Sequence, residues 1–167
     1  MAVILITGGA RSGKSTRAEA RARAFPGQPI YLATAEALDA EMEARIAKHR
    51  ARRGTDWLER EVPLDLVPAL LATDGGGARL VDCLTLWLSN LMHAARDWER
   101  EVRELAGALP RLSSPVVFVT NEVGLGIVPD NALARSFRDA AGIMNQIIAA
   151  VADEVEFVVA GLPMKLK

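Results

Sequence analysis

A glycine-rich segment directly after the first apolar run constrains this chain more than any other feature. The segment has the sequence Gly8-Gly9-Ala10-Arg11-Ser12-Gly13-Lys14-Ser15. It matches the pattern G-x-x-x-x-G-K-[ST], with a strand predicted before it at residues 3–7 and a helix after it at 15–24. Backbone N–H groups of such a loop surround the β-phosphate of a nucleoside triphosphate, and the helix N-terminus adds partial positive charge. We therefore predict a phosphate-binding loop rather than a chance glycine-rich turn.

Three side chains have predicted roles at this loop. The ammonium group of Lys14 can reach the β- and γ-phosphates, which makes it a candidate catalytic residue, and the Ser15 hydroxyl is a candidate Mg²⁺ ligand. Asp82 closes the apolar run Leu80-Val81 within the strand predicted at residues 78–83. Because the carboxyl ends of parallel strands share one crevice, we predict Asp82 as the acidic partner of the same Mg²⁺. The alternative is that Asp82 only caps the helix that follows.

Short apolar runs alternate with helical patterns, which predicts an α/β fold. Strands are predicted at residues 3–7, 30–33, 78–83, 116–120 and 155–160, with a further one at 57–62, where Arg60 and Glu61 interrupt the apolar pattern. Helices are predicted at residues 15–24, 39–53, 64–72, 85–95, 98–109 and 131–152. Together these indicate a single P-loop NTPase-like domain over residues 1–167, a mostly parallel sheet with helices on both faces.

Charge and composition exclude several classes of protein. The formal net charge of −1 provides no basic field for nucleic acid or a membrane surface. The single cysteine, Cys83, cannot form an internal disulfide, so a reducing compartment is permitted. The apolar N-terminus is too short for a signal peptide, and no stretch approaches the length of a membrane span. We expect a cytoplasmic protein without nucleic-acid partners.

A basic cluster ends the helix predicted at residues 39–53, with the sequence Lys48-His49-Arg50-Ala51-Arg52-Arg53. A solvated cationic helix end is the simpler interpretation. However, His49 continues the apolar stripe of Met42 and Ile46 at helical spacing. The surrounding cations disfavour a protonated imidazole and attract polyphosphate, and a neutral imidazole is a nucleophile. His49 is therefore a candidate nucleophile, whereas His93 is expected to have a packed or surface role.

An apolar loop at residues 123–129 follows the strand predicted at 116–120, on the same sheet edge. Apolar loops are unusual at a protein surface, so this loop indicates a binding wall or a subunit contact.

Taken together, these segments resemble the bifunctional adenosylcobinamide kinase/adenosylcobinamide-phosphate guanylyltransferase family. The resemblance keeps order and spacing over nearly the whole chain. It rests on residues 8–15, 31–35, 45–46, 49–50, 82–85, 90–91, 119–124, 126–129, 131, 135, 137–139, 142, 145–146 and 152–155.

The resemblance implies two reactions in cobalamin assembly. The first phosphorylates the corrinoid substrate adenosylcobinamide with a nucleoside triphosphate such as ATP, and the second transfers GMP from GTP to that phosphate through a guanylylated histidine, here His49. It also implies a homotrimer with the apolar loop near subunit contacts. In the family this resemblance implies, the position of Asp82 is occupied by either Glu or Asp. The implied nucleotide contacts are Gly8, Gly9, Ala10, Arg11, Ser12, Gly13, Lys14, Ser15, Ala33, Thr34, Ala35, Arg50, Ala51, Arg52, Arg53, Glu61 and Asp82.

Three other functions compete with this one. A P-loop small-molecule kinase without nucleotidyl transfer explains the phosphate loop but leaves His49 without a task. A GTPase switch requires an N-K-x-D motif, yet Asn121 is followed by Glu-Val-Gly, and it requires D-x-x-G, yet Asp82 is followed by Cys-Leu-Thr. A nucleic-acid motor requires a broad basic face, which the charge balance does not provide.

Overall fold

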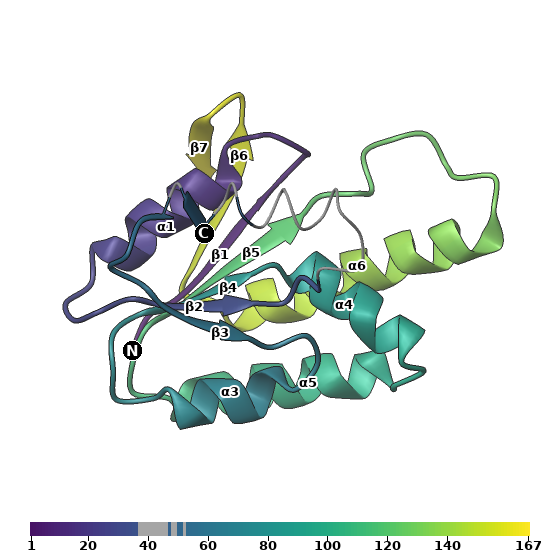
Figure 1. The fold of residues 1–167 in the computed structure, drawn as a ribbon. Coiled ribbons are helices and arrows are strands. Elements are labelled where there is room, and N and C mark those ends of the chain that lie inside the picture. Colours follow the sequence, from purple (N-terminus) through teal and green to yellow (C-terminus); the bar gives the residue numbers. More distant parts are fainter. Residues whose placement is uncertain (37–46, 48–49, 52) are drawn as a thin grey trace.

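The computed structural model describes residues 1–36, 47, 50–51 and 53–167, and its strands form one seven-stranded sheet (Figure 1). The strands are β1 (Val3–Gly8), β2 (Ile30–Ala33), β3 (Leu58–Glu61), β4 (Arg79–Asp82), β5 (Val116–Asn121), β6 (Glu154–Val159) and β7 (Leu162–Lys165). Their order is β3-β2-β4-β5-β1-β6-β7, and all neighbours pair in parallel except β6 and β7. The predicted mostly parallel α/β sheet is confirmed, including the strand expected within residues 57–62.

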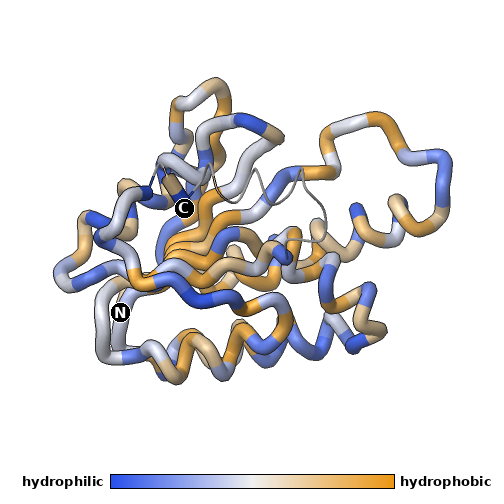
Figure 2. The backbone as a smooth tube through the Cα atoms, in the orientation of Figure 1, coloured by the Kyte–Doolittle hydropathy of each residue, from blue (hydrophilic) through white to orange (hydrophobic). Residues whose placement is uncertain are grey.

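Helices cover both faces of the sheet, as predicted. They are α1 (Lys14–Arg23), α3 (Leu66–Ala72), α4 (Leu84–His93), α5 (Trp98–Ala108) and α6 (Ala132–Val151), with a short 3₁₀ helix at Leu109–Arg111. Alternate residues of β1 enter different cores: Ile4 and Ile6 pack with α1, whereas Val3 and Leu5 pack with the cluster that includes α3, α5 and α6 (Figure 1). The central strands are hydrophobic along their length, while edge strand β3 is hydrophilic (Figure 2).

The predicted helix bounds agree with the structure to within two residues, because the end signals are local. Helix α6, for example, starts after Asn131, whose side chain accepts a hydrogen bond from the N–H of Ala134. The helix predicted at residues 39–53 falls largely outside the described residues. None of the helices in the described part of the chain combines the length and apolar character needed to cross a bilayer.

Strand β7 is absent from the predicted elements, and this is a correction to the predicted sheet. Val159 pairs with Leu162 across a two-residue turn in which Ala160 and Gly161 both have positive φ, 50° and 81°. Such a turn matches the twist of a β-hairpin. Pro163 lies in the strand, and a proline is tolerated there because β7 is an edge strand.

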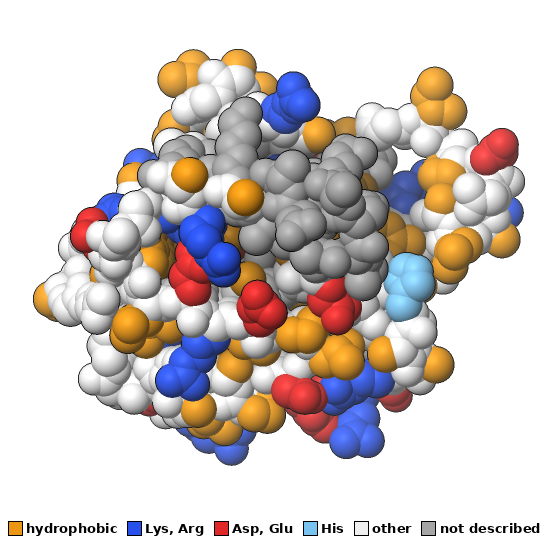
Figure 3. All heavy atoms as spheres, in the orientation of Figure 1, with side chains coloured by type: hydrophobic (Ala, Val, Ile, Leu, Met, Phe, Trp, Pro, Cys, Tyr) orange, Lys and Arg blue, Asp and Glu red, His pale blue; other side chains and the backbone are white. Residues whose placement is uncertain are grey.

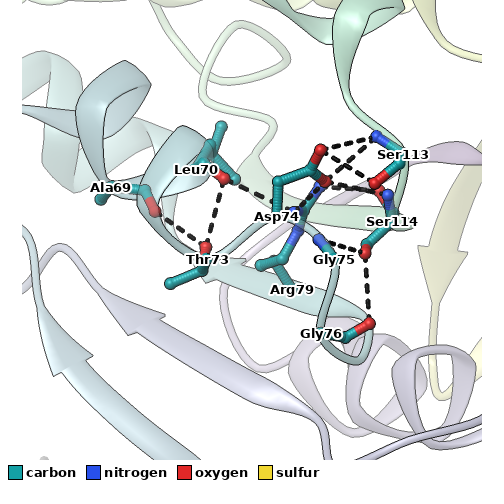
Figure 4. Close-up of polar contacts among 9 residues, drawn as sticks. All are labelled: Ala69, Leu70, Thr73, Asp74, Gly75, Gly76, Arg79, Ser113 and Ser114. Carbon is teal, nitrogen blue, oxygen red and sulfur yellow. Dashed lines mark hydrogen bonds and ion pairs between the residues drawn. The ribbon is translucent and has the colours of Figure 1, made fainter.

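A buried polar network holds the amino-terminal end of the sheet (Figure 4). Arg79, fully buried at the start of β4, donates to Asp74 Oδ1 at 2.7 Å and to the carbonyl oxygen of Ser114 at 2.6 Å. Burial opposes ionisation of Asp74, but the N–H groups of Ser114 and Ser113, together with Arg79, hold the pKa of its carboxyl well below the usual range. This network ties the end of α3 to the segment before β5, far from the phosphate loop.

Candidate functional site

The predicted phosphate loop lies between β1 and α1. Strand β1 ends at Gly8, and Gly13 is the N-cap of α1 with φ of +95°. The N–H of Ser12 donates to the carbonyl oxygen of Gly9 at 3.3 Å, which closes the turn. The buried side chain of Lys14 extends back over the loop, and its Nζ donates to the same Gly9 oxygen at 2.9 Å. The ammonium group and the start of α1 thus concentrate positive charge on one loop.

Two of the loop glycines have no room for a side chain, independently of any role in phosphate binding. A Cβ atom at Gly8 would stand 2.5 Å from the carbonyl oxygen of Val158, and one at Gly13 would stand 3.1 Å from Cα of Gly161. The N–H of Gly161 also donates to the carbonyl oxygen of Ser12 at 2.8 Å. The β6–β7 hairpin therefore supports the phosphate loop from behind, a contact that the sequence analysis does not predict.

Asp82 lies on the same edge and the same face of the sheet as the loop. Strand β5 separates β4 from β1, and the register aligns Asp82 with Val119 and Val119 with Ile6. Two strand spacings put Asp82 about 10 Å from β1. Leu80, two residues earlier in β4, packs in the core under α1, so the Asp82 side chain points to the α1 face. Asp82 and the phosphate loop therefore lie on one face at one edge of the sheet, with β5 between their strands.

The capping alternative for Asp82 is not supported. The N-cap residue of α4 is Cys83, not Asp82. Instead, Oδ2 of Asp82 accepts a 2.9 Å hydrogen bond from the hydroxyl of Tyr31. The Asp82 side chain is half-buried, and within the described part of the chain its carboxylate has this one hydrogen bond, on Oδ2.

The residue types at this edge fit Mg²⁺. Among the described residues there is no group of three or more His, Cys, Asp or Glu side chains able to hold a metal on its own. Mg²⁺ keeps several waters and usually takes one or two protein ligands together with substrate phosphates. Asp82 and the Ser15 hydroxyl are ligands of this kind, and they would hold a metal that arrives with the nucleotide.

Thr34, predicted to contact nucleotide, is completely buried and joins the ends of β2 and β4. Its hydroxyl donates to the carbonyl oxygen of Cys83 and accepts from the N–H of Cys83, both at 2.8 Å, and its own N–H donates to the carbonyl oxygen of Asp82 at 3.2 Å. Asn90 donates to the Thr34 carbonyl oxygen at 2.8 Å. Thr34 therefore fixes the strand end that carries Asp82. Its contact with nucleotide remains a prediction, as does that of half-buried Ala33.

A cleft of about 420 Å³ opens beside this strand end. It is lined by Ala35, Glu36, Leu64, Leu86, Ser89, Asn90, His93 and Ala94. The walls combine apolar side chains with polar ones, and Ala35 is the predicted nucleotide contact that lies in it. His93 is exposed at the end of α4, and its Nδ1 lies 2.7 Å from the carbonyl oxygen of Ser89. Its expected lack of a chemical role remains a prediction.

The predicted basic cluster is described only in part, because His49 and Arg52 lie outside the described residues. Arg50 and Ala51 are exposed, whereas Arg53 is buried. Arg50 Nε donates to one oxygen of Glu59 at 2.6 Å and Arg53 to the other at 2.5 Å. Burial raises the pKa of Glu59, but the two arginines outweigh it and lower that pKa overall. Glu61 is exposed at the end of β3.

The apolar loop after β5 projects from the body of the protein (Figure 1). Leu125 and Ile127 are 82% and 97% exposed, and Val123 and Val128 are also exposed. Hydrophobic side chains are visible on this projection and on the β6–β7 hairpin (Figure 3). Exposed apolar side chains so concentrated are typical of an interaction surface.

Sequence reasoning missed two residues at this site. Tyr31 contacts Asp82, and Gly161 supports the phosphate loop. Each meets a partner far away along the chain, and only the order of strands brings these pairs together.

The fold and the loop define the chain as a protein of the P-loop NTPase class. A solved structure of the flagellar accessory protein FlaH from Methanocaldococcus jannaschii superimposes with a TM-score of 0.60 and 15% sequence identity, covering 99% of this chain and 78% of that one. The P4 protein of bacteriophage phi6, solved with ADP, has a TM-score of 0.53 at 16% identity over 98% of this chain and 54% of its own. At these identities the similarity concerns the fold alone.

Sequence comparison defines the family. Residues 4–166 match the family of cobinamide kinase / cobinamide phosphate guanyltransferase, and the chain belongs to it. It is 48% identical to the bifunctional adenosylcobalamin biosynthesis protein CobP of Pseudomonas aeruginosa, over 98% of this chain and 96% of that protein. It is 45% identical to the bifunctional adenosylcobalamin biosynthesis protein CobU of Salmonella typhimurium, over 99% of each.

Proposed function

We propose that this chain phosphorylates adenosylcobinamide and then transfers GMP from GTP to the resulting phosphate, giving adenosylcobinamide-GDP. The observation that carries the proposal is the placement of Lys14, the start of α1 and Asp82 on one sheet edge, in a chain that matches bifunctional relatives along its length. A single nucleotide cleft then serves both reactions.

In the first reaction, the hydroxyl on the aminopropanol arm of the corrinoid attacks the γ-phosphorus of a nucleoside triphosphate. The new O–P bond replaces the bond to the β-phosphate, the nucleoside diphosphate leaves, and the hydroxyl proton passes to solvent. The loop N–H groups and Lys14 neutralise charge on the transferred group. Mg²⁺, held through Asp82 and Ser15, supplies further charge stabilisation when bound.

In the second reaction, the imidazole of His49 attacks the α-phosphorus of GTP and pyrophosphate leaves. The phosphate of the corrinoid then attacks the same phosphorus, which breaks the P–N bond and releases free His49. Division into two displacements replaces one difficult step with two easier ones. Arg50, Arg52 and Arg53 belong to the same basic segment as His49 and would balance phosphate charge.

We also propose that the protein is a cytoplasmic homotrimer, with the exposed apolar loop in its subunit contacts. Leu125 and Ile127 would be unfavourable in water but favourable in a subunit contact. Light scattering of the purified protein tests the trimer, and Ile127→Ser should shift the mass toward the monomer.

Product analysis tests the function. The purified protein is incubated with adenosylcobinamide, ATP, GTP and Mg²⁺, and the corrinoid products are identified by mass spectrometry. We expect adenosylcobinamide phosphate when GTP is replaced by an analogue that cannot be cleaved between its α- and β-phosphates, and adenosylcobinamide-GDP in the complete mixture. Accumulation of the phosphate alone in the complete mixture would support the kinase without nucleotidyl transfer.

A further inference from the structure

Tyr31 occupies a fixed position between the basic segment and Asp82. Its ring is buried, with 6% of the residue exposed. The guanidinium carbon of Arg53 lies 3.5 Å from the centre of the ring, and Trp57 packs at an interplanar angle of 89° with ring centres 6.1 Å apart. Arg53 and Trp57 therefore fix the orientation of the ring, and with it the position of the hydroxyl oxygen.

The hydroxyl of Tyr31 is always a donor near neutral pH. A tyrosine hydroxyl ordinarily has a pKa of about 10, so it is protonated near neutral pH. The hydroxyl keeps its proton and donates it to Oδ2 of Asp82 at 2.9 Å. One oxygen of the carboxylate is thus occupied by a hydrogen bond before any metal ion arrives.

We propose that Tyr31 is a positioning residue that makes Asp82 a single-oxygen ligand for Mg²⁺ through Oδ1 and so sets the choice of divalent cation at the nucleotide site. The inference rests on the proposed metal role of Asp82. Mg²⁺ requires near-octahedral geometry with single oxygens at about 2.0–2.1 Å, whereas Ca²⁺ accepts six to eight oxygens and often takes both oxygens of a carboxylate. A hydrogen bond on Oδ2 favours the first mode and opposes the second.

Arg53 and Trp57 have a supporting part in this arrangement. Arg53 is also anchored by its 2.5 Å hydrogen bond to Glu59, and it lies over the ring rather than against the carboxylate. Trp57 packs against the ring, and among the described residues it is Tyr31, not Trp57, that donates to Oδ2 of Asp82. Substitution of Trp57 therefore changes packing without changing the number of hydrogen bonds on Oδ2. Trp57→Phe is therefore a matched control for Tyr31→Phe.

The test compares cation preference, not turnover. The dissociation constant of a non-hydrolysable GTP analogue is measured by calorimetry in Mg²⁺ and again in Ca²⁺, for the full-length protein. We expect the wild type to bind more tightly in Mg²⁺, and Tyr31→Phe to reduce that preference about three- to tenfold, the size of the usual net effect of one hydrogen bond. Trp57→Phe should leave the ratio of the two constants unchanged, even if it lowers the melting temperature.

An unchanged ratio in Tyr31→Phe would overturn the inference. Asp82→Asn separates this failure from failure of the proposed metal role. If Asp82→Asn removes the preference for Mg²⁺ and Tyr31→Phe does not, only the Tyr31 inference is wrong. If Asp82→Asn also leaves the preference intact, both the metal role of Asp82 and the Tyr31 inference are wrong. The two proposed reactions are tested separately, by the analysis of their products.

Discussion

The N–H of Gly161 donates a 2.8 Å hydrogen bond to the carbonyl oxygen of Ser12, so the turn of the β6–β7 hairpin braces the phosphate loop. The same turn approaches Gly13 so closely that a Cβ atom there would stand 3.1 Å from Cα of Gly161. The shape of the loop thus depends on an element more than a hundred residues further along the chain.

Gly13→Ala should damage the loop for two reasons. Its φ of +95° is unfavourable for a residue with a Cβ atom, by about 1–2 kcal/mol, and the Cβ would crowd Gly161. We expect a lower melting temperature and at least about tenfold weaker binding of nucleotide by calorimetry, an effect of about 1.4 kcal/mol. Gly142→Ala is the control, because no atom lies within 4 Å of the added Cβ and the residue is inside α6, where alanine stabilises by up to about 1 kcal/mol. Equal effects of the two substitutions would contradict the bracing role.

Lys14→Ala should abolish both reactions together. The Lys14 ammonium group lies over the loop, and loss of such a group costs about 10²–10³-fold in rate. Kinase and guanylyl transfer are assayed separately, with Lys165→Ala as a control because Lys165 is exposed on β7. Survival of one activity near the wild-type level would require two nucleotide sites.

Asp82→Asn should lower activity and leave stability nearly unchanged. The substitution keeps the shape of the side chain and can still accept from Tyr31, but it removes the charge that a hard cation needs. Thermal unfolding and Mg²⁺-dependent activity are measured on the same preparation. A large loss of stability with activity retained would show that Asp82 acts on the fold.

Local signals explain what the sequence predicts correctly. The phosphate loop is a contiguous pattern, and β1 and β5 are continuous apolar runs because both of their faces are buried. Helix α6 has a polar N-cap and apolar positions at helical spacing. Asp82 could be assigned to the edge of the sheet because it closes its own strand.

The parts that could not be predicted depend on neighbours distant in sequence. Strand β7 has only four residues and includes Pro163, so its pattern is weak, although the two-residue turn before it is a local signal for a hairpin. The contact between Tyr31 and Asp82 depends on β2 pairing with β4, which no local pattern specifies. Thr34 follows β2 beside the site, yet its hydroxyl is hydrogen-bonded to Cys83.

Asp74→Ala should destabilise the fold without affecting the site directly. It would leave the fully buried guanidinium of Arg79 without its carboxylate, a change that costs about 3–5 kcal/mol. The control is Asp65→Ala, because Asp65 is 70% exposed in its ion pair with Arg96 and should cost less than about 1 kcal/mol. Denaturant unfolding measures both, and equal costs would contradict the account of the network.

The Asp74 network also predicts a dependence on pH. The pKa of Asp74 is depressed in the folded protein, so its stabilisation is complete above the unfolded pKa, about 3.9, and is lost as pH falls below that value. The difference in unfolding free energy between wild type and Asp74→Asn should therefore be constant near neutrality and shrink below about pH 4. A difference that grows on acidification would contradict the assigned sign.

Transfer of label from α-labelled GTP to the protein tests the central claim most directly. A guanylylated His49 contains a P–N bond, so label on the wild-type protein should survive alkali and be lost in acid. His49→Asn should take up no label, lose guanylyl transfer and still phosphorylate adenosylcobinamide. Acid-labile guanylate on the His49→Asn protein would contradict the assignment and direct attention to His93.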